Sequence, residues 1–291
     1  MDERETARGV VVGWDGSAQG ETALRWATDE ARRRKAPLTV VHSWDVYVGP
    51  WSTAIVFPVT DVETAARGLL AEGVRHARED VADVRGVLGR GTPAETLLKA
   101  AEHADLVVVG SRSHSAVGDL VTGSAAAEVA AHAPCPVVVV RGPLEVGGSG
   151  TPGPVVAGVD GSPASLEAVG VAFAEAALRG VPLELVLAWP RSVRPDPAPL
   201  VDADGLRDVA EERLFRLAAP WREKYPDVAV RADVVDGSPR DVLLSAAEHA
   251  ALVVVGTRGR GGFRGLLFGS VSRALLDHAP CPVAVAHAAD S

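Results

Sequence analysis

Residues 100–110 read AAEHADLVVVG, and residues 246–256 read AAEHAALVVVG, so that this stretch occurs twice with a single difference at Asp105. A second stretch, HAPCPV at residues 132–137, returns unchanged at residues 278–283. Near the start of each copy the tripeptide Asp-Gly-Ser also recurs, at residues 15–17 and 160–162. Chance does not produce such agreement at a nearly constant offset. The sequence therefore predicts a tandem duplication of one ordinary domain.

The join between the two copies is rich in glycine and proline from Pro143 to Gly153. Such a composition is typical of a flexible linker rather than of a helix or strand. We therefore expect a first domain at residues 1–142, a linker at residues 143–153 and a second domain at residues 154–291.

Each copy alternates short β-branched runs such as LVVVG with longer helical patterns. In the first copy we expect strands at residues 10–14, 38–44, 84–88, 106–109 and 137–140, and helices at residues 18–34, 61–79, 93–103 and 124–131. Continuous apolar strands separated by helices indicate a parallel sheet that is covered on both faces. The predicted fold class is α/β: two tandem, open, five-stranded parallel-sheet domains with helices on both faces, of Rossmann-like type.

The composition narrows the class of protein. Of the 291 residues 47% are hydrophobic and 23% charged, which is the balance of a folded chain, and the formal net charge is −9. No domain-wide positive field is available for nucleic acid or an anionic membrane, so neither is expected as a partner. The sequence has no membrane-length apolar run and no secretory signal, which predicts a cytoplasmic location. Cys135 and Cys281 each lie in a Pro-Cys-Pro triplet, and we expect both to be reduced and half-buried.

Ligands of open parallel sheets bind beyond the carboxyl ends of the strands, where the strand order reverses. The first strand of each copy is followed by an acidic residue there, Asp15 in Gly13-Trp14-Asp15 and Asp160 in Gly158-Val159-Asp160. An Asp at this edge could face a ligand. Taken alone, however, the Asp-Gly-Ser tripeptide is also typical of a simple turn in which the Asp caps the next helix. Both readings stay open from the tripeptide itself.

The fourth strand of the second copy runs into a glycine-rich loop in which Gly256, Gly259, Gly269 and Ser270 are spaced as G-x2-G-x9-G-S. Glycines allow backbone N–H groups to approach a ligand, and a helix that starts at Gly-Ser offers free N–H groups to an anion. The spacing predicts a phosphate cradle. Three arginines lie in or beside this loop and add positive charge: Arg258, Arg260 and Arg264.

Other site motifs are absent from the sequence. It has no Gly-Lys pair, which excludes the P-loop signature, and its G-x-G-x-x-G at residues 148–153 lies in the linker, outside a strand–helix context. The eight histidines lack metal-ligand spacing, and no nucleophile–base signature is present. We assign no catalytic residue and no metal site.

This combination resembles the ATP-binding branch of the universal stress protein family in its tandem two-domain form. The resemblance rests on the G-x2-G-x9-G-S loop, on Asp160 and on the Pro-Cys-Pro-Val start of the last strand, and it covers nearly the whole chain. It implies that the Asp and the second strand hold adenine and ribose, while the glycine loop holds the phosphates. For the first domain the implied ATP-binding residues are Gly13, Asp15, Val41, Gly110, Ser111, Arg112, Ser113, His114, Gly123 and Ser124. For the second domain they are Gly158, Asp160, Ala188, Gly256, Thr257, Arg258, Gly259, Arg260, Gly261, Gly262, Gly269, Ser270 and Val271.

The first copy departs from the family pattern at one position, because Ser113 replaces the middle glycine. If that position needs a left-handed backbone, Ser costs on the order of 1 kcal/mol more than Gly, and its side chain crowds the phosphates. We therefore expect the second site to bind the nucleotide more tightly than the first.

The resemblance implies a nucleotide-dependent regulator or sensor of stress that holds ATP, with or without Mg²⁺, and performs no dedicated catalysis. The alternative is an enzyme that hydrolyses ATP slowly or transfers adenylate. It also implies that the last strands, at residues 137–140 and 283–285, pair across an interface and that the chain forms a homodimer. We also expect a protein partner, whose identity the sequence does not give.

Overall fold

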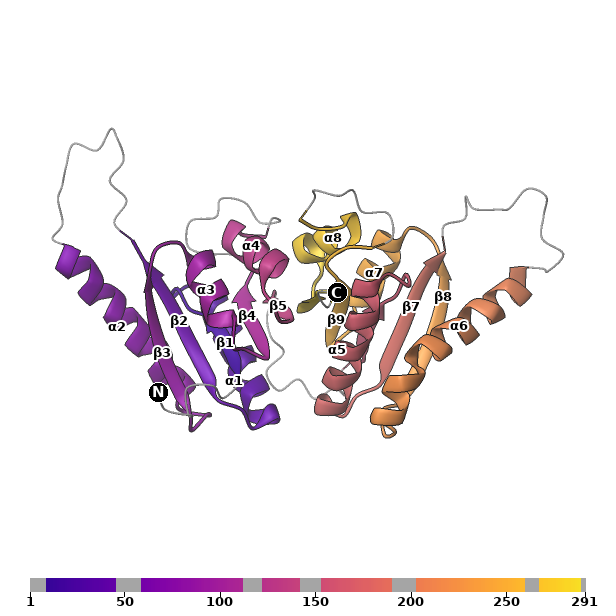
Figure 1. The fold of residues 1–291 in the computed structure, drawn as a ribbon, viewed down its shortest axis with the longest axis horizontal. Helices are drawn as coiled ribbons and strands as arrows, with labels where there is room; N and C mark the ends of the chain where they lie inside the picture. Colours follow the sequence, from indigo (N-terminus) through magenta and orange to yellow (C-terminus); the bar gives the residue numbers. More distant parts are fainter. Residues whose placement is uncertain are drawn as a thin grey trace, which may run out of the picture. The chain divides into compact units, whose positions relative to one another are not determined.

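The computed structural model describes residues 9–45, 59–111, 122–141, 153–189, 203–259 and 267–288. The chain divides into two compact units, Met1–Leu144 and Glu145–Ser291 (Figure 1). Strands and helices alternate along the described part of each unit, as the sequence predicts. The α/β fold class with two tandem parallel-sheet domains is confirmed.

The first unit contains one parallel sheet in the order β3-β2-β1-β4-β5. Helices α1 and α2 pack against each other, and α3 packs against α4, so that two helices lie over each face of the sheet (Figure 1). Its elements are β1 (Val10–Gly13), α1 (Ala18–Arg34), β2 (Leu38–Trp44), α2 (Val59–Ala77), β3 (Val84–Arg90), α3 (Pro93–Ala101), β4 (Leu106–Gly110), α4 (Ser124–His132) and β5 (Val137–Val140).

The second unit repeats this arrangement in the order β10-β9-β6-β7-β8. Here α5 packs against α6 and α7 against α8. Its elements are β6 (Val155–Gly158), α5 (Pro163–Arg179), β7 (Leu183–Trp189), α6 (Ala203–Lys224), β8 (Val230–Asp236), α7 (Pro239–Ala247), β9 (Leu252–Gly256), α8 (Ser270–His278) and β10 (Val283–Ala286).

Strands β4, β5 and β9 are built from the repeated apolar runs of the sequence. Every residue of β5 is buried, as are the first four residues of β4 and of β9. Burial on both faces is what a parallel strand between two helical layers requires, and it explains why these strands read as unbroken valine and leucine. Cys135 and Cys281, which precede the last strands, are buried rather than half-buried.

Local signals set the helix ends. The side chain of Ser17 accepts the Gly20 N–H at the start of α1, and Ser162 does the same for Ser165 at the start of α5. Thr92 and Glu95 form a reciprocal capping box at the start of α3. These caps fix where each helix leaves the carboxyl edge of the sheet, which is where the predicted site lies. None of the helices in the described ranges has the length and apolar character needed to cross a membrane.

Candidate functional site

The strand order reverses once in each unit. In the second unit the connections from β6 and β9 leave in opposite directions, and in the first unit those from β1 and β4 do so. A crevice for a ligand forms at the carboxyl edge of a sheet at such a point. The loops that carry Asp160 and Gly256–Gly259 therefore both face the switch point of the second unit.

Asp160 organises the turn after β6. Its Oδ1 accepts the Ser162 N–H at 2.9 Å, and Ser162 in turn caps α5. The Ser162 hydroxyl also donates to the carbonyl oxygen of Arg258 at 3.4 Å, which joins this turn to the loop after β9. The structure thus assigns Asp160 the turn-forming role that the tripeptide allows, and half-exposed Asp160 also borders the glycine loop.

Two glycines of the loop lie where the fold has no room for a side chain. A Cβ on Gly256 would come within 2.7 Å of the Ala164 backbone at the start of α5. A Cβ on Gly259 would collide with Oδ2 of Asp160. Gly256 is therefore required by packing, whereas Gly259 lets the loop lie directly against the carboxylate.

The third glycine stands at the start of α8. Gly269 is the N-cap of that helix, and no side chain caps the helix there. Its N–H donates to the Thr257 carbonyl at 2.9 Å, and the buried Ser272 hydroxyl donates to the same carbonyl at 2.8 Å, which ties the helix start to the loop. A Cβ on Gly269 would make only ordinary contacts, at 3.5 Å or more. Neither packing nor its backbone angles require a glycine here, so the space in front of the helix is what glycine preserves.

The first domain repeats the main features of this geometry. Asp15 accepts the Ser17 N–H at 3.0 Å and the Ser17 hydroxyl at 2.6 Å through the same oxygen. A Cβ on Gly110 would meet the Gln19 carbonyl at 2.9 Å, which matches the packing of Gly256. Gly123 is the N-cap of α4 without a side-chain cap, and its N–H donates to the Ser111 carbonyl at 2.8 Å. Ser124 is exposed beside it.

The second strand of each domain borders the crevice from the other side. Val41 pairs with Gly13, and its carbonyl accepts the Trp14 N–H at 2.8 Å. In the second domain the residue that pairs with Gly158 is Val186, whose carbonyl accepts the Val159 N–H at 2.9 Å. The register therefore makes Val186 the counterpart of Val41. Ala188 lies two residues farther along β7.

Part of the predicted site lies outside the residues that the structure describes. These positions are Arg112, Ser113 and His114 in the first domain and Arg260, Gly261 and Gly262 in the second. Thr257 is buried, Arg258 and Ser270 are exposed and Val271 is half-buried. No cluster of His, Cys, Asp or Glu suited to a metal ion occurs among the described residues.

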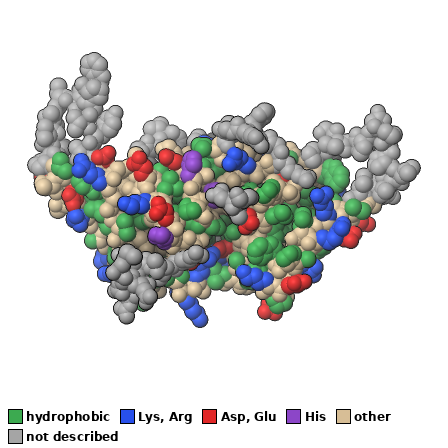
Figure 2. Space-filling view, in the orientation of Figure 1, with side chains coloured by type: hydrophobic (Ala, Val, Ile, Leu, Met, Phe, Trp, Pro, Cys, Tyr) green, Lys and Arg blue, Asp and Glu red, His purple; other side chains and the backbone are tan. Residues whose placement is uncertain are grey.

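Each domain thus presents an acidic turn, a packed glycine and an uncapped helix start at one switch point. Free N–H groups at a helix start attract an anion, because they carry the positive end of the helix dipole. Acidic and basic side chains are interspersed on the face shown in Figure 2. The fold and site define a tandem α/β protein of the doubly wound, ligand-binding class.

The family profile described as the universal stress protein family matches residues 7–141 and 153–287. The chain belongs to this family, and its name places the protein among those of the stress response. A universal stress protein of Mycobacterium tuberculosis is 38% identical over 294 residues, which covers 98% of this chain and 99% of that protein. One of Mycolicibacterium smegmatis is 35% identical over 297 residues, with 98% and 99% covered.

Solved structures are similar over the whole tandem arrangement. The crystal structure of a universal stress protein from Archaeoglobus fulgidus superposes with a TM-score of 0.71 at 17% identity, covering 97% of this chain and 98% of that chain. A putative universal stress protein from Pseudomonas aeruginosa gives a TM-score of 0.64 at 19% identity, covering 98% and 95%. At these identities the similarity shows a shared fold.

Proposed function

We propose that this universal stress protein binds ATP at the carboxyl edge of its second domain and uses the bound nucleotide as a regulatory signal. The observation that carries the proposal is the convergence of Asp160, Gly259 and Gly269 around a helix start that no side chain caps. Backbone donors at such a place suit the phosphates of a nucleotide. The carboxylate beside them suits the hydroxyl groups of a ribose.

The chain's own residues divide the work of holding the ligand. The N–H groups of Ser270 and Val271 at the start of α8 would hold the phosphates, and Arg258 would add positive charge from the loop. Asp160 would accept hydrogen bonds from the ribose. The adenine would lie beside β7, near Val186 and Ala188. Where Mg²⁺ accompanies the nucleotide, the phosphates would hold it, because we assign no protein ligand to the ion.

A regulatory role follows from what the proposed site offers. Backbone donors and a turn-forming Asp can bind and orient a nucleotide, and we assign no general base to them. Bound ATP shifts a conformational or assembly equilibrium by the difference in its affinity for the two states. In this proposal the protein acts in the cytoplasm as a homodimer and passes the signal to a protein partner. Slow hydrolysis of ATP or transfer of adenylate is the competing function.

The two domains should differ in affinity. In the second domain a Cβ at Gly259 would collide with the Asp160 carboxylate, and the first domain has Ser113 at the corresponding position of the motif. The side chain of Ser113 would meet the same obstacle if the first domain adopted the same arrangement. This supports tighter binding at the second site.

The test is to denature freshly purified protein and to identify the released small molecules by chromatography and mass spectrometry. Intact ATP, in stoichiometric amount for at least one site, is the expected result. Mainly ADP or AMP would favour the hydrolytic alternative. If no adenine nucleotide is released and none binds when ATP is added, the proposed function is wrong.

A further inference from the structure

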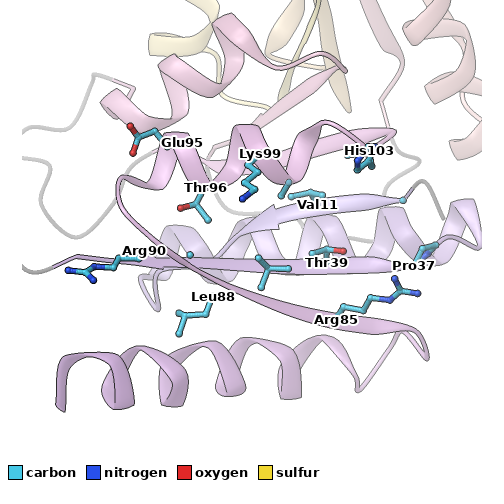
Figure 3. Close-up of a pocket in the computed structure, with 15 residues that line it drawn as sticks. Val11, Pro37, Thr39, Arg85, Leu88, Arg90, Glu95, Thr96, Lys99 and His103 are labelled. Atoms are coloured by element: carbon cyan, nitrogen blue, oxygen red, sulfur yellow. The ribbon is translucent and has the colours of Figure 1, made fainter. Parts of the chain in front are cut away.

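A second concave site lies in the first domain, on the face of the sheet that α3 covers. It is a groove of about 580 Å³ between α3 and the sheet, and none of its lining residues belongs to the predicted nucleotide site. Helix α3 begins close to the sheet. A Cβ on Gly89 of β3 would collide with the side chain of Thr96, so only glycine allows this close approach. The groove runs along the sheet beside this helix (Figure 3).

Basic side chains border one end of the groove from two sides, whereas its other end carries one basic and one acidic side chain, Arg90 and Glu95 (Figure 3). Lys99 comes from α3, His103 comes from the turn that follows this helix, and Arg85 comes from β3 opposite them (Figure 3). The floor between them is a row of paired residues on adjacent strands, in which Thr39 stands between Val11 and Arg85. Thr39 therefore occupies the centre of the basic end.

In the second domain, the position equivalent to Thr39 carries an acidic residue. Glu184 replaces Thr39, because it pairs with Arg231 in the register in which Thr39 pairs with Arg85. The Glu184 carboxylate lies 3.4 Å from Nε2 of His249, the counterpart of His103. The second domain thus places a carboxylate of its own against this histidine.

A second replacement also adds negative charge to this surface of the second domain. Asp233 stands where the first domain has Val87, and its carboxylate lies 3.2 Å from Nε of Arg231. Lys99 has no basic counterpart, because the matching position is Ser245. The second domain therefore supplies two carboxylates to this surface, whereas the first supplies a threonine and a valine and adds a lysine.

We propose that the groove of the first domain binds an acidic peptide in extended conformation, with a Glu or Asp carboxylate at the place that Glu184 fills in the second domain. Complementary charge is the reason for an acidic partner. Asp83 lies 3.6 Å from Arg85, but both side chains are about half exposed, at 43% for Arg85 and 58% for Asp83. An ion pair of this kind contributes little, so that it competes weakly with an incoming carboxylate.

The shape of the groove favours a peptide over a compact organic acid. A small-molecule site buries most of its ligand, but here Arg85, Lys99 and His103 are exposed and the outer side of the groove is the edge strand β3. An extended peptide gains contacts along the strand and helix instead. The exposed Val87 offers apolar surface to side chains that alternate with the acidic ones.

The test uses the full chain and a fluorescein-labelled octapeptide in which glutamate alternates with valine or serine. Fluorescence anisotropy at low salt should give saturable binding that weakens as salt is added, because screening reduces the attraction. Lys99→Glu and Arg85→Glu should each weaken binding by at least about tenfold, since they place like charges against the peptide. Thr39→Glu should have the same effect by supplying the internal carboxylate of the second domain.

The duplicate copy provides matched controls. Ser245→Glu and Arg231→Glu place a glutamate at the equivalent positions of the second domain and should leave peptide binding unchanged. A peptide with lysine in place of glutamate should not bind. The proposal is overturned if the acidic peptide does not bind, if the control variants weaken it equally, or if free glutarate displaces it at equal concentration. Because ATP plays no part in this assay, its outcome is independent of the proposed function.

Discussion

The three glycines at the end of β9 and in the loop after it have different structural roles, although they form one sequence motif. Gly256 allows β9 to lie against the start of α5, and Gly259 allows the loop to lie against Asp160. Gly269 alone has space around it. A substitution at each position should therefore affect either folding or ligand binding, according to what the glycine meets.

Gly256→Ala should lower the free energy of unfolding by about 1–3 kcal/mol, because the new methyl group overlaps the Ala164 backbone. Gly269→Ala should lower it by no more than about 0.5–1 kcal/mol, because the added methyl group makes only ordinary contacts and the remaining cost is that alanine is a poorer N-cap than glycine. Urea denaturation of both variants without nucleotide measures the difference. Equal destabilisation by the two substitutions would show that Gly269 also serves packing.

The two cysteines should be inert in the folded protein. Burial raises the pKa of Cys135 and of Cys281 from 9.0 to about 11, and the nearby Asp105 adds to the effect at Cys135. At pH 8 nearly all of each thiol is therefore protonated, and the thiolate is the reactive form. An aromatic disulfide reagent should label both cysteines slowly in the native state and rapidly in urea. Rapid labelling of the native protein would contradict this environment.

At the scale of elements, the sequence predicted well wherever the hydrophobic pattern was continuous. Helix α1 and strands β2 and β5 have the predicted bounds, whereas α2 begins at Val59 instead of Asp61. Strand β3 continues to Arg90, because its last residues pair with the end of β2 through Trp44. Glycine and arginine give no strand signal, so that only the neighbouring strand reveals this extension.

Helix α2 offers an internal comparison between two glycines. A Cβ on Gly68 would meet nothing within 4 Å, but one on Gly73 would lie 2.8 Å from the Trp14 ring. Gly68→Ala should raise the free energy of unfolding by about 0.5–1 kcal/mol, because alanine restricts the unfolded chain and favours the helix. Gly73→Ala should lower it. Thermal unfolding of both variants tests the pair, and destabilisation by Gly68→Ala would contradict the exposed position of that residue.

At the scale of the whole molecule, the duplication and both switch points could be predicted from the sequence, because the repeated stretches contain the strands and the glycines. The equivalence of Val41 and Val186 could not, since no motif marks it and only the strand register reveals it. The groove beside α3 was also beyond prediction. It depends on which residues of β2, β3 and α3 face one another across the sheet.

The duplication makes the relative affinity of the domains testable. Gly123→Ala and Gly269→Ala place the same methyl group before α4 and α8, the two helix starts without a side-chain cap. We expect Gly269→Ala to remove the tighter phase of ATP binding and Gly123→Ala to affect only a weaker one. Tryptophan fluorescence follows the titration, because Trp14, Trp44 and Trp189 lie at the strand ends. Identical losses from the two variants would show that Ser113 does not weaken the first site.

The most direct measurement of the central proposal is a calorimetric titration of ATP into nucleotide-free protein, made side by side with the wild type and Gly269→Ala. The wild type should bind ATP, and the variant should bind it at least about tenfold more weakly. The reason is that the methyl group fills the space in front of α8, so that the phosphates lose charge-assisted hydrogen bonds from the helix start. Its free energy of unfolding should fall by no more than about 1 kcal/mol, so that the protein stays folded. Absence of heat from the wild type, or unchanged affinity in the variant, would contradict ATP binding at the start of α8.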